Sequence, residues 1–282
     1  MKGAVLALYR VRMLILVVST AVLVAIAVFG PLFTGVPRSV RTTLVGVALV
    51  GWGVTLLLVL IGPRLLPRSD AVKVHAPVRG RWLAMNSPAS RVPSHGIRMY
   101  GQAHAIDLVY EPDRTARPVF GSASAMRPNG DYPAFGQPVF AMVDGVVVKA
   151  SDWRRDHRAR SSMLGLLYLM VEGMIREFGG PGFIVGNHVT IRMDDGRYAA
   201  VAHLQRGSVV VRVGDTVRRG SVIAKCGNSG NSSEPHVHAQ IMDRQSLLLA
   251  QGVPMVFTEI ALGLEPEQID ALPRNDEHMT AA

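Results

Sequence analysis

Two long stretches without a charged side chain stand near the beginning of this 282-residue sequence. They run from Met13 to Val36 and from Thr42 to Pro63, over 24 and 22 residues. Either is long enough to cross a bilayer as a helix, which needs about 20 predominantly apolar residues. Cleavable signal peptides have shorter apolar cores of about 7 to 15 residues. We therefore expect a transmembrane helical hairpin over residues 1–63, in contact with membrane lipid, with spans at about 13–35 and 43–62.

The turn between the two spans is short, Pro37 to Arg41, so both ends of the hairpin lie on the same side of the membrane. The rest of the chain is then on the side of the N-terminus. Basic residues are enriched on the cytoplasmic side of membrane proteins. Two lie in the turn, Arg38 and Arg41, and five lie outside the hairpin turn: Lys2, Arg10, Arg12, Arg64 and Arg68. This distribution favours a cytoplasmic location for the remainder of the chain.

The formal net charge of +9 is unevenly distributed. Residues 263–282 carry one arginine and five acidic side chains, a net charge of −4, which leaves +13 for residues 1–262. A basic body beside a membrane suits anionic lipid, cell-wall polyanions or nucleic acid. Binding of single-stranded nucleic acid favours aromatic side chains among the basic ones, and only 6% of this chain is aromatic. We expect no nucleic-acid partner, and the single cysteine, Cys226, excludes an internal disulfide.

Strand-like patterns dominate the second half of the sequence. Short runs rich in β-branched residues alternate with Gly, Asp and Asn at 139–148, 183–193, 198–204, 208–213, 222–226 and 236–242. Asp194-Asp195-Gly196 and Asp144-Gly145 have the composition of hairpin turns. The spacing predicts a mostly antiparallel sheet or sandwich. Residues 64–92, rich in Pro, Arg and small side chains, are interpreted as a linker and domain edge.

One segment has a helical rather than a strand-like period. Between residues 161 and 178, apolar side chains recur at 163, 166, 167, 170 and 174, with charged residues between them. The segment is apolar over more than half of its circumference. We expect an inserted helix whose apolar side packs on the sheet. A lid, or a helix that rests on the membrane surface beside the basic residues 154–160, is the alternative.

The placement of the histidines indicates a metal site. In Pro235-His236-Val237-His238, at the start of a predicted strand, side chains two positions apart point to the same face, so two imidazoles converge. His203 ends the strand predicted over residues 198–204. Asp107 lies in the apolar run Ala105-Ile106-Asp107-Leu108, where a carboxylate is costly to bury without a partner. A divalent cation would be such a partner.

Two glycine-containing motifs accompany these histidines. Gly-Asn-Ser-Gly-Asn-Ser at 227–232 comes just before the paired histidines, and Val-Gly-Asp-Thr-Val-Arg-Arg-Gly at 213–220 follows the Ala-His-Leu of residues 202–204. In this order, over roughly residues 75–243, the segments resemble the lysostaphin-type (LytM-like) zinc metallopeptidases. The resemblance implies that Asp107 and His238 are zinc ligands.

The resemblance further implies that His203 and His236 are catalytic, but one zinc ligand departs from the family pattern. The family places a histidine four residues before the aspartate, and that position here is Ala103. His104 is three residues before Asp107, an offset that points the two side chains to opposite faces of an extended chain. His95 lies twelve residues before Asp107, and a loop could bring it to the metal. We favour His95 over His104 as the third ligand.

These residues imply a metal-assisted hydrolase. A catalytic zinc has three protein ligands and an open position, where it lowers the pKa of a bound water and polarises a carbonyl. The motif contains no glutamate that could act as general base. His203 and His236 would therefore position or deprotonate that water and stabilise the oxyanion. The expected domain order is the hairpin 1–63, the linker and edge 64–92, a LytM-like domain over 93–250 with the insertion at 161–178, and an acidic tail at 251–282.

The resemblance favours a membrane-anchored zinc metalloendopeptidase that cleaves peptide bonds in peptidoglycan cross-links or stem peptides. The alternative is a non-catalytic scaffold or regulator of the same fold that binds wall peptide or a partner hydrolase. A biotinyl or lipoyl carrier is disfavoured, because such a domain needs a lysine at an exposed turn and Lys225 lies inside a predicted strand. A peptidoglycan substrate requires an extracytoplasmic domain, whereas the distribution of basic residues favours a cytoplasmic one. We expect the extracytoplasmic side, since a folded domain can translocate regardless of flanking charge.

Overall fold

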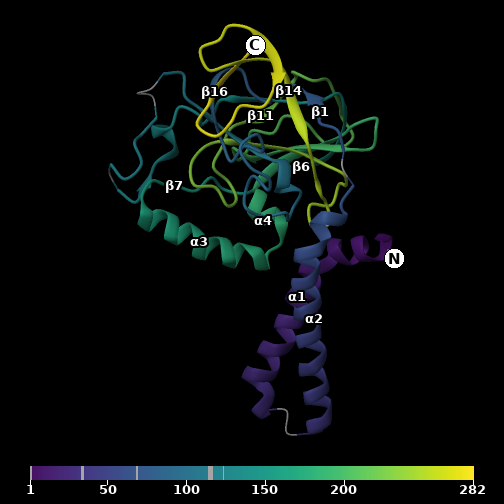
Figure 1. The fold of residues 1–282 in the computed structure, drawn as a ribbon. Coiled ribbons are helices and arrows are strands. Elements are labelled where there is room, and N and C mark those ends of the chain that lie inside the picture. Colours follow the sequence, from purple (N-terminus) through teal and green to yellow (C-terminus); the bar gives the residue numbers. More distant parts are fainter. Residues whose placement is uncertain (1, 33–34, 68, 114–116, 123) are drawn as a thin grey trace. The chain divides into compact units, whose positions relative to one another are not determined.

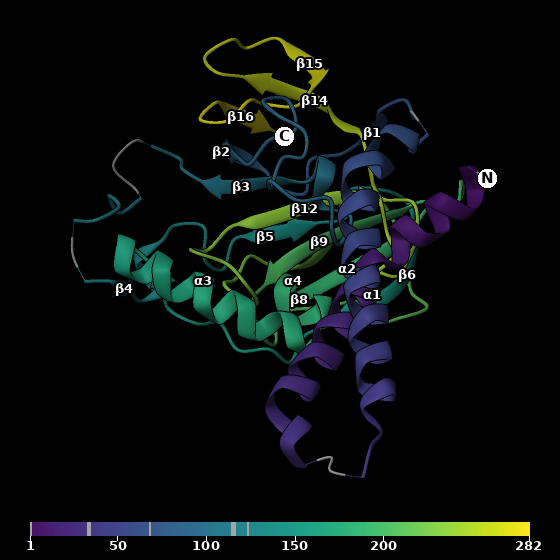
Figure 2. The same ribbon diagram turned by 60° about the horizontal axis from the view of Figure 1, so that its bottom comes forward.

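The structure of this chain is a computed structural model that describes residues 2–32, 35–67, 69–113, 117–122 and 124–282. It divides into two compact units, residues 1–68 and 69–282. Figures 1 and 2 show the helices of the first unit and the β-rich second unit.

The first unit is a hairpin of two apolar helices. It contains α1 (Lys2–Phe29), a short 3-10 helix η1 (Gly30–Leu32) and α2 (Arg38–Leu65). Small residues let the helices approach closely: a side chain added at Gly51 would meet the Ser19 hydroxyl, and one added at Gly62 would meet the ring of Tyr9. Both helices are long and apolar enough to cross a bilayer by length and composition, and their apolar windows are mostly exposed. The expected pair is present: α1 begins before the expected span 13–35 and ends within it, at Phe29, and α2 extends beyond 43–62 at both ends.

The second unit is mostly β. Its first strands are β1 (Val72–Val74), β2 (Gly80–Met85), β3 (Ile106–Tyr110), β4 (Met126–Arg127), β5 (Pro138–Phe140), β6 (Gly145–Ser151), β7 (Ala159–Arg160) and β8 (Asn187–Arg192). The later ones are β9 (Tyr198–Leu204), β10 (Thr216–Val217), β11 (Val222–Lys225), β12 (Val237–Met242), β13 (Gly252–Val253), β14 (Met255–Leu262), β15 (Gln268–Ala271) and β16 (His278–Ala281). Its helices are η2 (Gln102–His104), η3 (Asn129–Asp131), α3 (Met163–Phe178) and α4 (Pro181–Val185).

Most of these strands form one sheet in the order β1-β14-β16-β2-β3-β12-β9-β8-β6-β10, with β13 beside β12 and β15 beside β14. The pair β1 and β14 is parallel, and the other pairs are antiparallel. Strands β5 and β11, and β4 and β7, form two smaller sheets. The predicted mostly antiparallel architecture with an inserted helix is confirmed. Its central strands β3, β12 and β9 lie side by side and are almost entirely buried.

Local turn chemistry explains where the strand predictions hold and where they are wrong. Asp194-Asp195-Gly196 joins β8 to β9 as predicted, with Gly196 at a positive φ of 83°. Asp144-Gly145 joins no hairpin, because β5 pairs with β11 while β6 pairs with β8. Residues 208–213, all of them described, form no strand. The carboxylate of Asp152 accepts the backbone N–H groups of residues 207–209 and so replaces a strand partner.

The expected domain boundaries differ from the observed unit. The segment expected to be a linker and edge contributes β1 and β2 to the sheet, and the segment expected to be an acidic tail contributes β13 to β16. Trp82, Phe257 and Met279 from these two segments are buried in the core. The acidic residues misled the prediction because most of them lie outside the strands, while Phe257, Ile260 and Met279 in β14 and β16 are buried.

Truncating a core side chain in the C-terminal segment tests this correction. Phe257 is fully buried, and Phe257→Ala is expected to lower the free energy of unfolding by about 3–5 kcal/mol. The matched control is Leu264→Ala in the following turn, where the side chain is 96% exposed, with an expected change within about 0.5 kcal/mol. Urea unfolding followed by tryptophan fluorescence measures both. Equal stabilities of the two variants would show that this segment lies outside the core.

Helix α3 begins and ends close to the predicted residues. The Ser162 hydroxyl caps its N-terminus by accepting the backbone N–H of Gly165 at 3.2 Å. The expectation that its apolar side packs on the sheet is wrong. Of the helix, only Gly165 and Gly173 are buried. Nine large apolar side chains are exposed: Met163, Leu164, Leu167, Tyr168, Met170, Val171, Met174, Ile175 and Phe178.

Candidate metal centre

Strand pairing brings the predicted aspartate and one predicted histidine together. In the antiparallel pair of β3 and β12, Asp107 is directly opposite His238. Side chains at such positions share one face of the sheet, with Cβ atoms about 4.5–5.5 Å apart. On the other side of β12, His238 is opposite Ala202, so His203 at the end of β9 is the next residue along. The register of three buried strands thus places the three polar residues at one end of the sheet.

Three side chains converge on one point. His95 Nε2 lies 3.0 Å from Asp107 Oδ2, and His238 Nδ1 lies 2.9 Å from Asp107 Oδ1. Among the described residues, His95, Asp107 and His238 form a group in which one candidate ligand atom from each lies within 4.8 Å of the others. Two imidazole nitrogens and one carboxylate oxygen are the donor types that zinc prefers in catalytic sites. Asp107 and His238 are buried and His95 is nearly so, which suits a site held in place before a metal binds.

His95 reaches the group through the loop between β2 and η2. The Ser94 hydroxyl contacts His95 Nδ1 at 3.0 Å and the Gln102 carbonyl at 3.1 Å, and the Ser94 N–H donates to the Ala103 carbonyl. These bonds fold the loop back on η2 and direct the ring of His95 toward Asp107. His104, at the end of η2, lies outside the group, and burial together with Arg98 lowers its pKa. The structure therefore brings His95, and not His104, beside Asp107.

Two amide side chains that the sequence analysis missed hold this group in place. Asn86 donates to Asp107 Oδ2 at 2.8 Å. The Gln240 carbonyl oxygen lies 2.9 Å from His238 Nε2, and its amide nitrogen donates to the Tyr100 carbonyl, which fixes the orientation of the amide. In its neutral form His238 then carries its proton on Nε2 and turns the lone pair of Nδ1 toward the group, where a metal would bind; without a metal, a proton on Nδ1 can donate to Asp107 Oδ1. Gln240 could have been found from its position two residues after His238 on the same strand face.

His203 and His236 complete the site with their rings 4.7 Å apart. His203 Nδ1 lies 2.8 Å from the Ser229 carbonyl, and His236 Nδ1 lies 2.7 Å from the Glu234 carbonyl. Because a carbonyl only accepts, each Nδ1 carries a proton, and in the neutral ring the lone pair lies on Nε2. His236 Nε2 is 3.6 Å from Asp107 Oδ1. All five residues expected in the site are thus close together.

The electrostatics of the site favour an ionised aspartate and neutral His203. Burial of Asp107 disfavours its charge, yet His95 and His236 hold its pKa well below the usual value. Burial, helped by His236 and His238, lowers the pKa of His203 well below its usual value. Burial also disfavours charge on His238, but its hydrogen bond to Asp107 raises its pKa. His203 is therefore a neutral base at physiological pH.

The glycine-rich turn at 227–232 positions His203. The Ser229 carbonyl holds the ring as described, and the Ser229 hydroxyl donates to the Leu204 carbonyl at 2.8 Å. Gly230 has a positive φ of 80°, and a side chain there would meet the backbone of residues 184 and 186 at about 2.5 Å. His203 itself has a φ of 59°, which is rare for a residue other than glycine and concentrates at functional sites.

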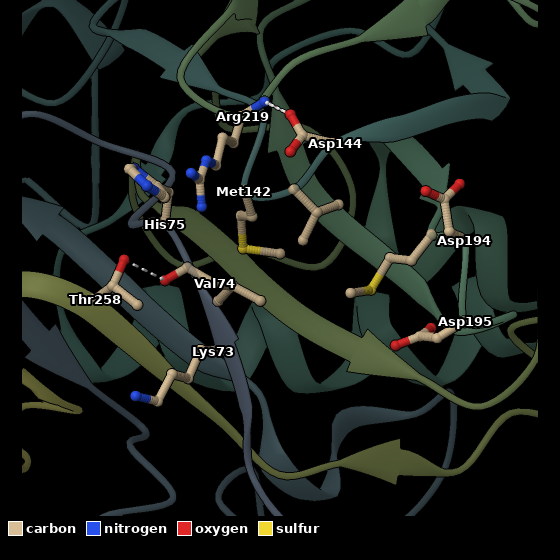
Figure 3. Close-up of a pocket in the computed structure, with 11 residues that line it drawn as sticks. Lys73, Val74, His75, Met142, Asp144, Asp194, Asp195, Arg219 and Thr258 are labelled. Carbon is tan, nitrogen blue, oxygen red and sulfur yellow. Dashed lines mark hydrogen bonds between the residues drawn. The ribbon is translucent and has the colours of Figure 1, made fainter.

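A separate pocket lies in the same unit (Figure 3). Its volume is about 420 Å³, and its lining includes His75, Asp144, Asp194 and Arg219. The Arg219 backbone N–H donates to the Asp144 carboxylate. Among the described residues, the lining contains none of the five that form the histidine and aspartate group. It is not part of the candidate centre.

One family model and several solved structures resemble parts of this chain. A family model described as Peptidase family M23 matches residues 168–249, which include His203, His236 and His238. Among solved structures, the catalytic domain of the antimicrobial peptidase lysostaphin from Staphylococcus simulans is 21% identical, with a TM-score of 0.32, over 55% of this chain and 80% of that one. The catalytic domain of the prophage-encoded M23 protein EnpA from Enterococcus faecalis, studied as a mutant, is 22% identical, with a TM-score of 0.27. The match covers 49% of this chain and 94% of that one.

A zinc-containing peptidase from Vibrio cholerae is 19% identical, with a TM-score of 0.26, over 53% of this chain and 48% of that one. This chain thus spans about half the length of that protein. The TM-scores are low, and the family match is independent of them. Together with the His–Asp–His group, which indicates zinc as the metal, the match of residues 168–249 to the Peptidase family M23 model supports metallopeptidase chemistry at this site.

Proposed function

We propose that this protein is a membrane-anchored zinc metalloendopeptidase that hydrolyses peptide bonds in peptidoglycan cross-links or stem peptides. The observation that carries the proposal is the convergence of His95, Asp107 and His238 beside two further histidines whose Nδ1 atoms are bound to backbone carbonyls, which leaves Nε2 of each for proton transfer. The family match over residues 168–249 supports the peptidase assignment.

In this proposal His95 Nε2, one oxygen of Asp107 and His238 Nδ1 hold the zinc. Two neutral nitrogens and one anionic oxygen leave the site a net positive charge. Bound zinc supplies a Lewis acid for the scissile carbonyl and lowers the pKa of an attacking water. Asn86 and Gln240 keep the ligand atoms directed at the metal through their hydrogen bonds to Asp107 and His238.

His203 and His236 perform the proton transfers. The ring that acts as base accepts the proton of the attacking water on its neutral Nε2. The other ring takes up a proton from solvent before the substrate binds, donates a hydrogen bond from Nε2 to the oxyanion of the tetrahedral intermediate, and keeps that proton. Each Nδ1–H stays hydrogen-bonded to its backbone carbonyl throughout, so each ring keeps its orientation. The accepted proton then passes to the leaving amine. Which of the two rings acts as base is decided by the separate variants described in the Discussion.

The substrate and location are inferred from the similar proteins and from the N-terminal helices. Lysostaphin is described as an antimicrobial peptidase. The two apolar helices could span a membrane, and with the short turn between them they would anchor the following unit at its surface. A peptidoglycan substrate places that unit on the extracytoplasmic side. C-terminal reporter fusions, one active only in the cytoplasm and one active only outside it, test this location.

The test of the proposed function is metal content together with hydrolysis, measured on the full chain in detergent. We expect about one zinc per chain and release of new amino termini from purified peptidoglycan, with both lost on chelation and restored by added zinc. A chain that binds no zinc and cleaves no peptidoglycan would contradict the proposal and favour the non-catalytic scaffold.

Replacing the two candidate histidines separately tests the ligand set. His95→Ala is expected to lower the bound zinc from about one per chain to well below half, because only two protein ligands remain. His104→Ala is the matched control: it also removes a partly buried imidazole, but one outside the group, and should keep the zinc. Inductively coupled plasma mass spectrometry of the purified variants measures both. Zinc lost from His104→Ala and retained in His95→Ala would reverse the assignment.

A further inference from the structure

Helix α3 turns its apolar side away from the protein. In a water-soluble domain, an amphipathic helix buries its apolar stripe and exposes its polar one. In α3 the arrangement is reversed: Leu164, Leu167, Val171, Met174 and Phe178 form one stripe at helical spacing, and each is more than half exposed. Figures 1 and 2 show α3 at the periphery of the β-rich unit.

Polar contacts hold α3 in this orientation. Glu172 forms ion pairs with Arg160 at 2.6 Å and with Arg176 at 2.8 Å. Glu177 accepts the hydroxyl of Tyr100, which anchors the C-terminal end of the helix. Because the charged side chains of α3 face the protein, turning the apolar stripe inward would break these pairs and leave Arg160, whose side chain is 3% exposed, without its partner.

Glycines make this close attachment possible. A side chain at Gly165 would meet the Ala125 carbonyl at 2.5 Å, and one at Gly173 would meet the side chain of Asn231 at 3.1 Å. The inward side of α3 therefore consists of small and charged residues, and the outward side consists of large apolar ones. Such a pattern suits a helix with protein on one side and an apolar medium on the other.

Aromatic residues extend the apolar surface beyond the helix ends. Phe120, half exposed, lies next to Gly121, whose N–H donates to the carbonyl of Ser161 just before α3. Beyond the C-terminal end, Trp153 is 62% exposed and packs edge-on against Phe183. The guanidinium of Arg154 lies over both rings, at 4.2 and 4.5 Å from their centroids. Tryptophan and arginine side by side are typical of helices that lie in the headgroup region of a bilayer.

The charge of the segment leading into α3 favours anionic lipid. Arg155 and Arg158 are exposed. The two acidic residues of this segment are engaged by the protein, since Asp152 accepts the backbone N–H groups of residues 207–209 and Asp156 accepts those of residues 206 and 228. Residues 152–160 carry four arginines and two aspartates, a net charge of +2, and basic residues near an anionic membrane surface are attracted to it.

We propose that the apolar face of α3, with Trp153 and Phe183, docks into the headgroup region of the anionic bilayer to which the N-terminal hairpin anchors the chain. The inference rests on the anchoring part of the proposed function. Only six residues separate the end of α2 at Leu65 from the start of β1 at Val72, so the chain can span about 20 Å between them. A unit tethered that closely meets the bilayer at a high local concentration.

Docking would also hold the candidate centre at the membrane surface. The guanidinium of Arg176 donates to the Gly230 carbonyl, and Gly173 packs on Asn231. Both partners belong to the 227–232 turn that positions His203. The helix and the turn are therefore attached to each other, and peptide hydrolysis would be confined to material next to the bilayer.

Site-directed spin labelling of the full chain in vesicles tests the docking. Leu167→Cys and Met174→Cys are labelled after reconstitution into vesicles of phosphatidylcholine and phosphatidylglycerol, and Val210→Cys, at a 68% exposed position outside α3, is the matched control. Cys226 is fully buried and does not compete for label. The ratio of oxygen to water-soluble nickel chelate accessibility should be on the order of tenfold higher at residues 167 and 174 than at residue 210.

Three other outcomes would overturn the inference, and the measurements distinguish them. Co-flotation with the vesicles reports the anchoring: a chain that does not float disproves the anchor. A chain that floats but has water-exposed labels at residues 167 and 174 disproves the docking alone. Dipolar broadening between labels on different chains that persists in detergent would show that a second copy covers α3. Leu167→Glu/Met174→Glu should keep flotation and zinc content and should expose a label at Val171→Cys to the chelate.

Discussion

Asp107→Asn is expected to remove the bound zinc and to lower kcat/KM for peptide hydrolysis by at least about a thousandfold. The substitution keeps the shape of the side chain but removes the negative charge, and zinc chemistry at this site depends on an anionic oxygen ligand. Asp107 is also the residue that both His95 and His238 contact, at 3.0 and 2.9 Å. An amide at this position would face two imidazoles with one nitrogen that can only donate, so the ligand atoms would no longer converge.

The matched control is Asp194→Asn in the turn between β8 and β9, where the carboxylate is exposed. This variant should keep about one zinc per chain and wild-type hydrolysis. Metal content by mass spectrometry and release of amino termini from peptidoglycan give the two readouts. Retention of one zinc per chain in Asp107→Asn would show that the metal lies elsewhere and would overturn the proposed site.

The strands that build the site can be predicted from the sequence because their patterns are local. The strand 198–204 is predicted with its observed bounds, since the Asp-Asp-Gly turn precedes it and small or β-branched residues fill it. The convergence of His236 and His238 follows from the two-residue period of an extended chain. The pairing of Asp107 with His238 is not readable from either segment alone, because 131 residues separate them and only the sheet register joins them.

The remaining features depend on tertiary contacts that leave no local signal. Asn86 is 21 residues from Asp107 and has a positive φ of 47°, and no pattern marks it in advance. The acidic composition led to the prediction of a tail, because most acidic side chains of this segment lie outside the strands, while buried residues such as Phe257, Ile260 and Met279 lie in β14 and β16. The orientation of α3 is another case: periodicity finds an apolar stripe but cannot tell which side of the helix the rest of the protein occupies. Here buried Arg160 and its ion pair with Glu172 settle that choice.

His203→Asn is expected to lower kcat by about a hundredfold to ten-thousandfold while zinc content and KM change little. His203 is not among the three converging ligands, and its free Nε2 is assigned to proton transfer, an effect of about that size for a positioned acid or base. Asparagine is chosen because the left-handed backbone of residue 203, with a φ of 59°, is tolerated by asparagine better than by alanine. The fold should therefore survive the substitution.

Parallel measurement of His236→Asn assigns the two roles. The ring that acts as general base should show the larger loss of kcat, and the variant lacking it should recover part of its rate as added imidazole replaces the missing base. His278→Asn in β16, which removes an imidazole that contacts Glu111 at 2.6 Å outside the site, is the control and should keep wild-type kcat. Full activity in both His203→Asn and His236→Asn would contradict the proton-transfer roles. Loss of zinc from either variant would instead make that histidine a ligand, and a site with four protein ligands would leave no open position for the attacking water.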